Sequence, residues 1–202
     1  TIEGRKIRDN LHNFVKTDVF IPGGGRPNTI NIDNWIKYLD AEGKPSSKII
    51  VEGANIFITD EARLKLEEKG VIIIKDSSAN KGGVICSSYE VIANLVLSEK
   101  EFLDIKDTYV KQVIEVLREK ALLEAELLLR EYNLSNKQIP LTTLSEKISY
   151  EINDLTQLIR NFIKNEFKEN HGMKALYEGQ LLEHCPKVLV ERYADRIKSV
   201  IP

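Results

Sequence analysis

The segment Val71–Ser88 combines a strand-like run with a polar, glycine-containing stretch, and this combination restricts the folds open to the chain. Val71–Ile74 contains only β-branched residues, which is typical of a strand buried on both faces of a parallel sheet. The residues of Ser77–Gly83 are small or polar, and their two glycines allow the backbone to approach a ligand closely. Apolar spacing then predicts a helix from about Val84. We therefore expect a strand, a binding loop and a helix whose free N–H groups face the loop.

Two earlier segments repeat this order of elements. A short apolar run near Asp18 ends in prolines and glycines, and apolar residues at helical spacing follow at Ile32, Trp35, Ile36 and Leu39. A second run near Lys48 ends in Gly53-Ala54-Asn55, and Thr59 is placed to open a helix that reaches Gly70. Strands with a helix in each gap are βαβ units, which require a parallel sheet with right-handed crossovers.

Parallel strands bring their carboxyl ends to one edge of the sheet, where ligands bind in open α/β folds. Here that edge carries the loop around Gly25, the turn Gly53-Ala54-Asn55 and the loop Asn80–Gly83. The glycines could serve only as turn residues, which is the common use of a glycine pair. Three unusual strand ends at one edge favour a binding site.

After Glu99 the chain shows no further strand pattern. Phe102–Tyr132 lacks glycine and proline and predicts a helix of about 45 Å. A second amphipathic helix follows Pro140, and shorter helices are predicted over Lys174–Glu183 and Pro186–Ile197. The predicted fold class is therefore α/β, with a parallel sheet of three βα units followed by an all-α region. We place the domain limits at residues 1–98 and 99–202, and we assign the leucine stripes to the core or to subunit contacts.

The composition excludes several classes of partner. Of the 202 residues, 29 are lysine or arginine and 31 are aspartate or glutamate, without a basic stripe, so nucleic acid is not expected as a partner. No apolar run approaches the roughly 20 residues that span a bilayer, so we expect no membrane association and a cytoplasmic location. Cys86 and Cys185 are far apart in the sequence and lack C-x-x-C spacing, so we expect free thiols in a reducing compartment. The three histidines lack ligand spacing, and no metal site is predicted.

Three runs of residues resemble a known family. These runs are D-V-F-I-P-G-G-G-R-P-N-T-I-N-I-D-N-W, K-I-I-V-E-G-A-N-I-F-I-T-D-E-A-R-L-K-L-E and V-I-I-I-K-D-S-S-A-N-K-G-G-V-I-C-S-S. They are similar to the C-terminal part of the large NAD-specific branch of the glutamate, leucine, phenylalanine and valine dehydrogenase family. The resemblance covers Gly4–Leu97 at the strength of motifs. It implies a partial Rossmann-type domain with NAD as cofactor, and oxidative deamination of L-glutamate to 2-oxoglutarate and ammonia.

Two asparagines match family positions that face the nicotinamide side of the cofactor, and two glycines follow the second of them. The resemblance implies that Asn55 and Asn80 bind NAD, since an amide offers both a donor and an acceptor to a carboxamide or a ribose hydroxyl. Gly82 and Gly83 would leave clearance for the backbone to approach the cofactor. Turn formation is the alternative role of both asparagines.

Two further residues are candidates for binding the substrate. Ser87 matches a family serine that helps to hold the side-chain carboxylate of glutamate, and we expect it in the first turn of the helix that begins near Val84. Arg26 is distinctive of the large branch and would meet a phosphate or a carboxylate. Helix capping and a surface salt bridge are the respective alternatives. Cys86 stands where a small hydroxyl residue is expected, which makes the pocket less polar.

No catalytic residue is assigned within the chain. The family opens its NAD domain with a glycine-rich fingerprint and places its catalytic lysine and aspartate further upstream, and none of these is present here. Lys81 and Asp76 are not given these roles. We therefore expect a fragment of a homo-oligomeric enzyme of amino acid catabolism that is inactive without its N-terminal domains. The alternative is a non-catalytic α/β module for regulation or oligomerisation.

Overall fold

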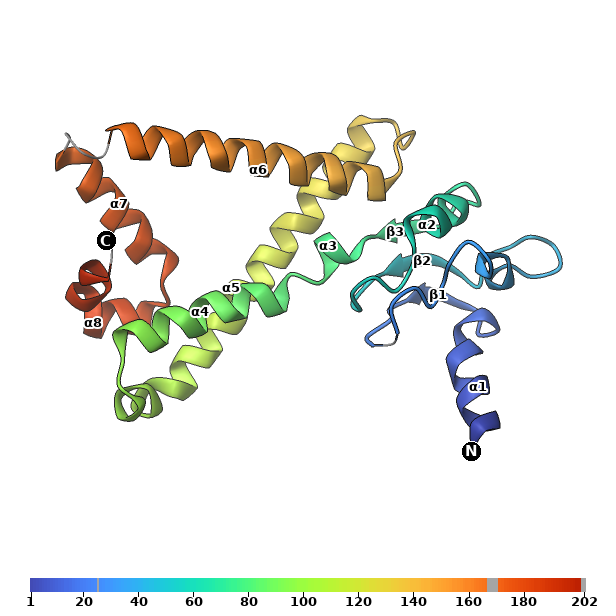
Figure 1. Ribbon diagram of the computed structural model, residues 1–202, viewed down its shortest axis with the longest axis horizontal. Helices are drawn as coiled ribbons and strands as arrows, with labels where there is room; N and C mark the ends of the chain where they lie inside the picture. Colours follow the sequence, from blue (N-terminus) through green and yellow to red (C-terminus); the bar gives the residue numbers. More distant parts are fainter. Residues whose placement is uncertain (25, 167–170, 201–202) are drawn as a thin grey trace. The chain divides into compact units, whose positions relative to one another are not determined.

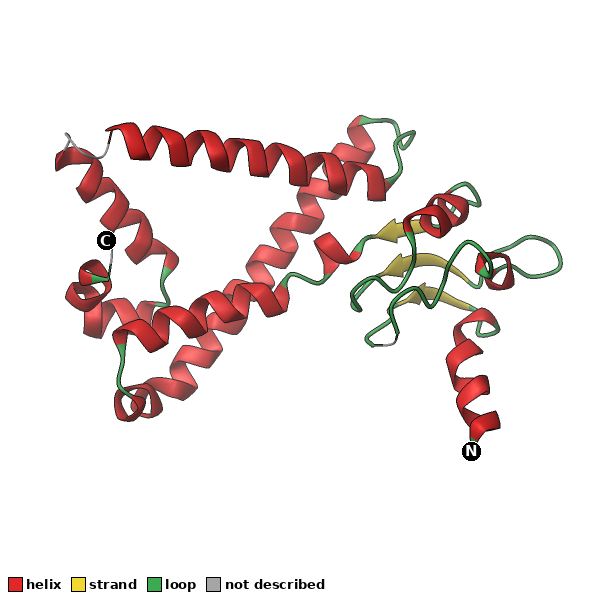
Figure 2. Ribbon diagram, in the orientation of Figure 1, coloured by secondary structure: helices red, strands yellow, loops and turns green. Residues whose placement is uncertain are grey.

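The structure is a computed structural model that describes residues 1–202 except 25, 167–170 and 201–202. The described residues form two compact units, which are treated separately below. The first unit comprises Thr1–Lys81 and Glu124–Ile148, and the second comprises Gly82–Leu123 and Ser149–Pro202. The predicted fold class is confirmed, because the strands form one parallel sheet and the chain after β3 is helical (Figures 1 and 2). The domain limits at residues 98 and 99 stay a prediction.

The sheet of the first unit contains three parallel strands in the order β1-β2-β3. The strands are β1 (Thr17–Phe20), β2 (Ser47–Val51) and β3 (Ile72–Ile74), and each starts within one residue of its predicted start. Helix α1 (Ile2–Asn10) and the short 3-10 helix η1 (Leu11–Asn13) precede β1. All three carboxyl ends therefore point to one edge, as expected from the βαβ pattern.

The β-branched strand β3 is covered on both faces, as its composition predicted. Ile73 is fully buried in a cluster with Ile50 and Leu66. Ile72 and Ile74 point the other way and pack on a second cluster that includes Leu128. Helix α2 (Asp60–Glu67) lies between β2 and β3, and the Thr59 hydroxyl caps it by accepting a hydrogen bond from the Ala62 amide.

The predicted helix Ile32–Leu39 is wrong, because only a 3-10 turn, η2 (Trp35–Tyr38), forms there. The side chain of Asn34 accepts a hydrogen bond from the Asn31 amide and donates one to the carbonyl of Thr29. Asn31 in turn accepts a hydrogen bond from the Asp33 amide. These local bonds to the backbone compete with an α-helix and stabilise a turn instead.

The predicted loop Ser77–Gly83 is shorter than expected. One helical turn, α3 (Asp76–Ala79), follows β3 almost directly, and helix α4 begins at Gly82 instead of near Val84. The Asp76 carboxylate accepts a hydrogen bond from the Ser77 amide, and this bond stabilises the turn. Only Asn80 and Lys81 remain between the two helices.

The rest of the chain is helical, as predicted. The helices are α4 (Gly82–Val96), α5 (Glu99–Leu134), α6 (Leu141–Glu166), α7 (His171–His184) and α8 (Lys187–Ser199). A buried cluster with Tyr89, Tyr109 and Leu189 joins α4, α5 and α8 within the second unit. Helices α5 and α6 each contribute residues to both units. No helix among the described residues is long and apolar enough to cross a membrane.

The start of α5 is held by a capping box and by an ion pair to α8. The Ser98 amide and hydroxyl both donate hydrogen bonds to the Glu101 carboxylate, and Arg196 contacts the same carboxylate at 2.9 Å. The Arg196 guanidinium and the bonds from Ser98 lower the pKa of Glu101 from 4.5 to about 2. Ionised Glu101 therefore contributes stability at neutral pH.

We expect this contribution to disappear as the pH falls from about 5 to about 2, since a depressed carboxyl pKa stabilises the folded state only where the group is ionised. Urea unfolding of the chain and of Glu101→Gln should show a difference that is constant above pH 5 and shrinks toward pH 2. Glu99→Gln, two residues earlier in the same helix, is the control. A difference between Glu101→Gln and the unsubstituted chain that does not change with pH would contradict the prediction.

Candidate functional site

The loops after β1 and β2 pack against each other at the carboxyl edge of the sheet. The Asn28 amide donates a hydrogen bond of 2.7 Å to the Ile56 carbonyl, and the Thr59 amide donates one of 2.9 Å to the Ile30 carbonyl. Gly53 suits this packing, because a Cβ at that position would make a tight contact of 3.1 Å with the Pro22 carbonyl oxygen. The glycine of the E-G-A-N run thus serves close approach of two backbones.

Asn55 and Asn80, the two asparagines predicted to bind the cofactor, meet at this edge. The Asn80 amide nitrogen Nδ2 donates a hydrogen bond of 2.6 Å to Oδ1 of Asn55. Asn55 belongs to the loop after β2, and Asn80 follows the single turn after β3. Asn55 is exposed and Asn80 is half-buried, so the pair presents polar groups to solvent at the edge where ligands bind in parallel sheets. Their binding role stays a prediction.

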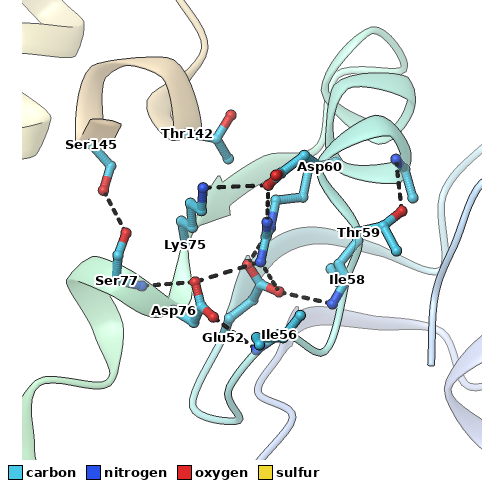
Figure 3. A network of polar contacts seen from close by, with 12 residues as sticks. Glu52, Ile56, Ile58, Thr59, Asp60, Lys75, Asp76, Ser77, Thr142 and Ser145 are labelled. Carbon is cyan, nitrogen blue, oxygen red and sulfur yellow. Dashed lines mark hydrogen bonds and ion pairs between the residues drawn. The ribbon is translucent and has the colours of Figure 1, made fainter. Parts of the chain in front are cut away.

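A buried charge pair adjoins the loop after β2, which carries Asn55. Figure 3 shows one member of the pair, Glu52, bonded to Ile58 of this loop. Glu52, the residue after β2, is fully buried, and Arg63 of α2 is 3% exposed. Arg63 donates from Nε to Oε2 of Glu52 at 2.7 Å and from Nη2 to Oε1 at 3.2 Å. Oε1 also accepts a hydrogen bond from the Ile58 amide, so the pair fixes the end of the loop.

Asp76 extends this network to the residue next to Asn55 (Figure 3). Its Oδ2 accepts a hydrogen bond of 2.8 Å from the Ile56 amide, and its Oδ1 lies 3.5 Å from Nη2 of Arg63. Ile56 has a φ of +52°, a left-handed conformation that is unfavourable for a β-branched residue. Such strain persists only where surrounding contacts impose it. The network therefore holds the backbone beside Asn55 in one conformation.

The charges of the network are arranged to hold the loops and side chains at this edge of the sheet in place. Burial raises the pKa of Glu52, and the opposing hydrogen bonds and charge of Arg63 limit that rise. Asp60 also contacts Arg63, and Lys75 lies 3.3 Å from Asp60 and binds Glu146 of α6. Each charged group thus faces an opposite charge, which restrains side chains and loops more than it prepares a group for proton transfer.

Arg63 and Glu52 were not assigned a role from the sequence, although a signal was present. Thr59, Ala62, Arg63 and Leu66 are spaced as one face of a helix, and Ala62, Arg63 and Leu66 are all buried. A charged residue on a buried face needs a partner, and the glutamate of E-G-A-N, directly after a buried strand, is the available one. Asp76, which was considered only as a catalytic group, is the third member.

Three further candidates from the sequence, Gly82, Gly83 and Ser87, lie on α4, in the second unit. Gly82 and Gly83 form its first turn, and a Cβ at either position would meet nothing within 4 Å. Ser87 is exposed, but it is the sixth residue of the helix, so its expected place in the first turn is wrong. The unpaired N–H groups of a helix belong to its first four residues, and α4 starts earlier than expected. The roles of these residues stay predictions.

Lys81 and Cys86 are held by neighbouring side chains. Lys81 Nζ makes a 2.7 Å ion pair with Glu124 of α5. The Cys86 thiol lies 3.5 Å from Oε1 of Glu90, and burial and this carboxylate raise its pKa. Cys86 and Cys185 are both free thiols. Among the described residues, no group of histidine, cysteine and acidic side chains could hold a metal ion.

Arg26 lies in a different place from the asparagine pair. It is exposed and lines a cleft of about 970 Å³ beside β1, together with residues of α1 and η1. Neither Asn55 nor Asn80 lines this cleft. His12 lies on its wall, stacked on Phe20 at 5.7 Å between ring centroids, and burial lowers its pKa. Gly25, the centre of the predicted first loop, lies outside the described residues.

Comparison with known proteins gives consistent matches. The sequence model of the glutamate/leucine/phenylalanine/valine dehydrogenases matches residues 2–137. A probable NAD-specific glutamate dehydrogenase of Schizosaccharomyces pombe is 42% identical over 172 residues, which cover 80% of this chain and 15% of that protein. Glutamate dehydrogenase 2 of Dictyostelium discoideum is 36% identical over 98% of this chain and 20% of its own length. The NAD-specific glutamate dehydrogenase of Neurospora crassa is 36% identical over 92% of this chain and 18% of its own length.

The chain corresponds to only a small part of each relative. The chain spans 15 to 20% of the length of these relatives. Residues 138–202 lie beyond the part matched by the family model, although the Dictyostelium relative covers nearly the whole chain. The sheet and its loops therefore carry the general family pattern, and the helices after residue 137 are shared with the longer relatives.

Proposed function

Because the chain belongs to the glutamate, leucine, phenylalanine and valine dehydrogenase family, we propose that it is part of an NAD-dependent glutamate dehydrogenase. In this proposal the whole enzyme converts L-glutamate to 2-oxoglutarate and ammonia, and NAD, when bound, accepts the hydride. Two of the relatives that match most of the chain are named as NAD-specific glutamate dehydrogenases, one of them as probable, which supports the choice of substrate and cofactor within the family.

The observation that carries the proposal is the contact between Asn55 and Asn80. Two amides from neighbouring strand ends share a hydrogen bond of 2.6 Å, and each keeps further donor and acceptor positions. An amide pair at the carboxyl edge fits the carboxamide and ribose of a nicotinamide nucleotide, which also combine donors and acceptors. The contact with Asn55 limits the freedom of Asn80, so less conformational entropy is lost when the cofactor binds.

The other residues have supporting roles in the proposal. Gly82 and Gly83 leave open space beside the start of α4, where a cofactor can approach the backbone. Ser87 donates a hydrogen bond to the side-chain carboxylate of glutamate. Arg26 has a long, exposed side chain at the cleft beside β1, and it binds an anionic group of the cofactor or the substrate.

Residues outside this chain complete the enzyme in the proposal. The edge strand β1, the residue after it and helix α1 expose apolar side chains, with Val19 at 40%, Ile21 at 62% and Ile7 at 63% exposure. Burial of such side chains is favourable, which supports a further part of the polypeptide packing here. That part would supply the pyrophosphate loop and the catalytic lysine and aspartate.

We also propose a homo-oligomer in the cytoplasm, where free thiols such as Cys185 persist.

The direct test is the activity of the full-length enzyme. Purified enzyme should reduce NAD with L-glutamate, with a much lower rate for NADP and for L-leucine or L-valine. NAD reduction that is independent of glutamate, or a clear preference for an apolar amino acid, would refute the proposed substrate. The chain of 202 residues, assayed in parallel, should show no turnover.

Ser87→Ala in the full-length enzyme tests whether Ser87 donates a hydrogen bond to the side-chain carboxylate of glutamate. Hydrogen bonds to charged groups contribute about 1.5 to 3 kcal/mol, and we expect the lower end because Ser87 is exposed and lies beyond the first helical turn. The Michaelis constant for glutamate should therefore rise about tenfold. Ser88→Ala, whose hydroxyl bonds the Ile85 carbonyl, is the matched control. Equal losses toward glutamate and norvaline would mean that Ser87 does not contact the carboxylate.

A further inference from the structure

The helical turn that precedes Asn80 is too short to be stable by itself. Helix α3 has four residues, and an isolated turn is unfavourable because its first hydrogen bonds do not offset the backbone entropy that is lost. The turn nevertheless determines where Asn80 lies, since the Asn80 amide donates a hydrogen bond of 2.8 Å to the Asp76 carbonyl. Contacts from elsewhere in the first unit must therefore stabilise α3.

One of these contacts comes from the segment where α5 ends and α6 begins. We call residues 124–148, the part of both helices that belongs to the first unit, the hairpin tip. The Ser145 hydroxyl of α6 lies 2.7 Å from the hydroxyl of Ser78 and 3.2 Å from that of Ser77, both in α3. Figure 3 shows the side chains of Ser145 and Ser77 directed toward each other. Ser145 is 2% exposed, so its hydrogen bonds form in a low-dielectric environment, where they are stronger than in water.

A second contact restrains the residue after Asn80. Lys81 Nζ lies 2.7 Å from a carboxylate oxygen of Glu124, at the start of the hairpin tip. The side chains are 39% and 20% exposed, so solvent partly screens this ion pair. The backbone of Asn80 thus lies between two connections to the hairpin tip, one through the serines before it and one through the lysine after it.

The hairpin tip is itself held against the sheet. Its three buried leucines pack against isoleucines of β3. Thr142 of α6 donates from its amide and its hydroxyl to the carboxylate of Glu67, at the end of α2, over 3.3 and 2.7 Å. Lys75, the residue before α3, forms an ion pair with Glu146. These contacts give Ser145 a defined position relative to β3, as is required of a residue that orients a binding group.

We propose that Ser145 is a positioning residue of the cofactor site, which holds α3 and thereby fixes the Asn80 amide at the carboxyl edge of the sheet. Ser145 lies beyond residues 2–137, the part matched by the family model, so this support comes from outside the matched region. The inference rests on the proposed function, because it takes Asn80 as a residue that binds NAD.

Hydrogen exchange of the full-length enzyme without NAD tests the structural step. Ser145→Ala should speed amide exchange in peptides that span Lys75–Lys81 by about two- to tenfold, the factor that one neutral hydrogen bond contributes to an equilibrium. The matched control is Thr142→Val, which removes a buried hydroxyl of the same helical turn that contacts α2 instead. It should leave exchange of these peptides unchanged, because the buried leucines still hold the hairpin tip. Exchange that Ser145→Ala does not alter, or that both variants raise equally, would refute the positioning role.

Titration of the full-length enzyme with NAD tests the functional step. Ser145→Ala should raise the dissociation constant for NAD at least about twofold, because affinity falls with the fraction of molecules in which α3 is ordered. The Michaelis constant for glutamate should change less, and Thr142→Val should leave NAD binding unchanged. In the Asn80→Ala background, Ser145→Ala should have no further effect, since it acts through Asn80. Losses that multiply in the double variant would refute the positioning role.

The results separate this inference from the proposed function. An enzyme that reduces NAD with glutamate, but whose affinity for NAD is unchanged in Ser145→Ala, retains the proposed function and refutes only the positioning role. An enzyme that does not reduce NAD with glutamate refutes the proposed function, and the role of Ser145 toward NAD with it.

Discussion

Arg63→Met is expected to lower the free energy of unfolding by about 3 to 5 kcal/mol. The substitution leaves the fully buried Glu52 carboxylate without the guanidinium that now lies 2.7 Å away. Breaking a buried ion pair by removing one partner is strongly destabilising, because the remaining charge has no solvent to replace the lost contact. Urea unfolding followed by fluorescence measures the loss in the first unit, since Trp35, the single tryptophan, packs against that core.

Two controls separate this effect from general damage to α2. Lys65→Met removes an exposed ion pair with Glu68 from the same helix and should cost less than about 1 kcal/mol. Adding Glu52→Gln to Arg63→Met removes the unpaired charge and should recover part of the stability. Burial already raises the pKa of Glu52, so the cost of Arg63→Met should also be smaller at pH 5 than at pH 8, where the carboxylate must be ionised. Equal costs for Arg63→Met and Lys65→Met would show that the buried pair contributes little.

Asn80→Ala in the full-length enzyme is expected to weaken NAD binding by about 1 to 3 kcal/mol, which corresponds to roughly five- to 150-fold. The amide of Asn80 would no longer contact the cofactor, and Asn55 would lose the partner that donates to it at 2.6 Å. The Michaelis constant for glutamate should change less, because the asparagine pair is assigned to the cofactor. Steady-state kinetics with NAD and glutamate varied separately measure both effects.

A double-mutant cycle with Asn55→Ala tests whether the two amides act together. Residues in direct contact that share a function show coupling of about 0.5 to 3 kcal/mol, so the double variant should lose less than the sum of the single losses. Asn153→Ala, an exposed asparagine on α6, should leave NAD binding unchanged. An unchanged Michaelis constant for NAD and unchanged turnover in Asn80→Ala would reduce Asn80 to a residue of the turn.

Local sequence patterns were sufficient to predict the main strands and helices. The β-branched run at β3, the cap at Thr59 and the apolar spacing of α5, α6 and α8 depend on neighbours within a few residues, so the sequence predicted them correctly. The convergence of Asn55 and Asn80 also followed from the sequence, because parallel strands must end at one edge. The expected helix over Ile32–Leu39 failed for a local reason, since asparagine side chains compete for the backbone.

Contacts between residues distant in the sequence were decided only by the tertiary structure. The bonds of Arg63 to Glu52 and Asp76, and the left-handed Ile56 that Asp76 holds, join the ends of two strands and one helix, and no periodicity specifies such a set. Burial is equally non-local. The helical spacing of Ile152, Leu155, Ile159 and Phe162 on α6 is visible in the sequence, but their exposure depends on what the rest of the chain covers. The sequence determined the strands, the helices and the shared edge, and packing determined which charges pair and which apolar face stays open, because desolvation depends on every neighbouring atom.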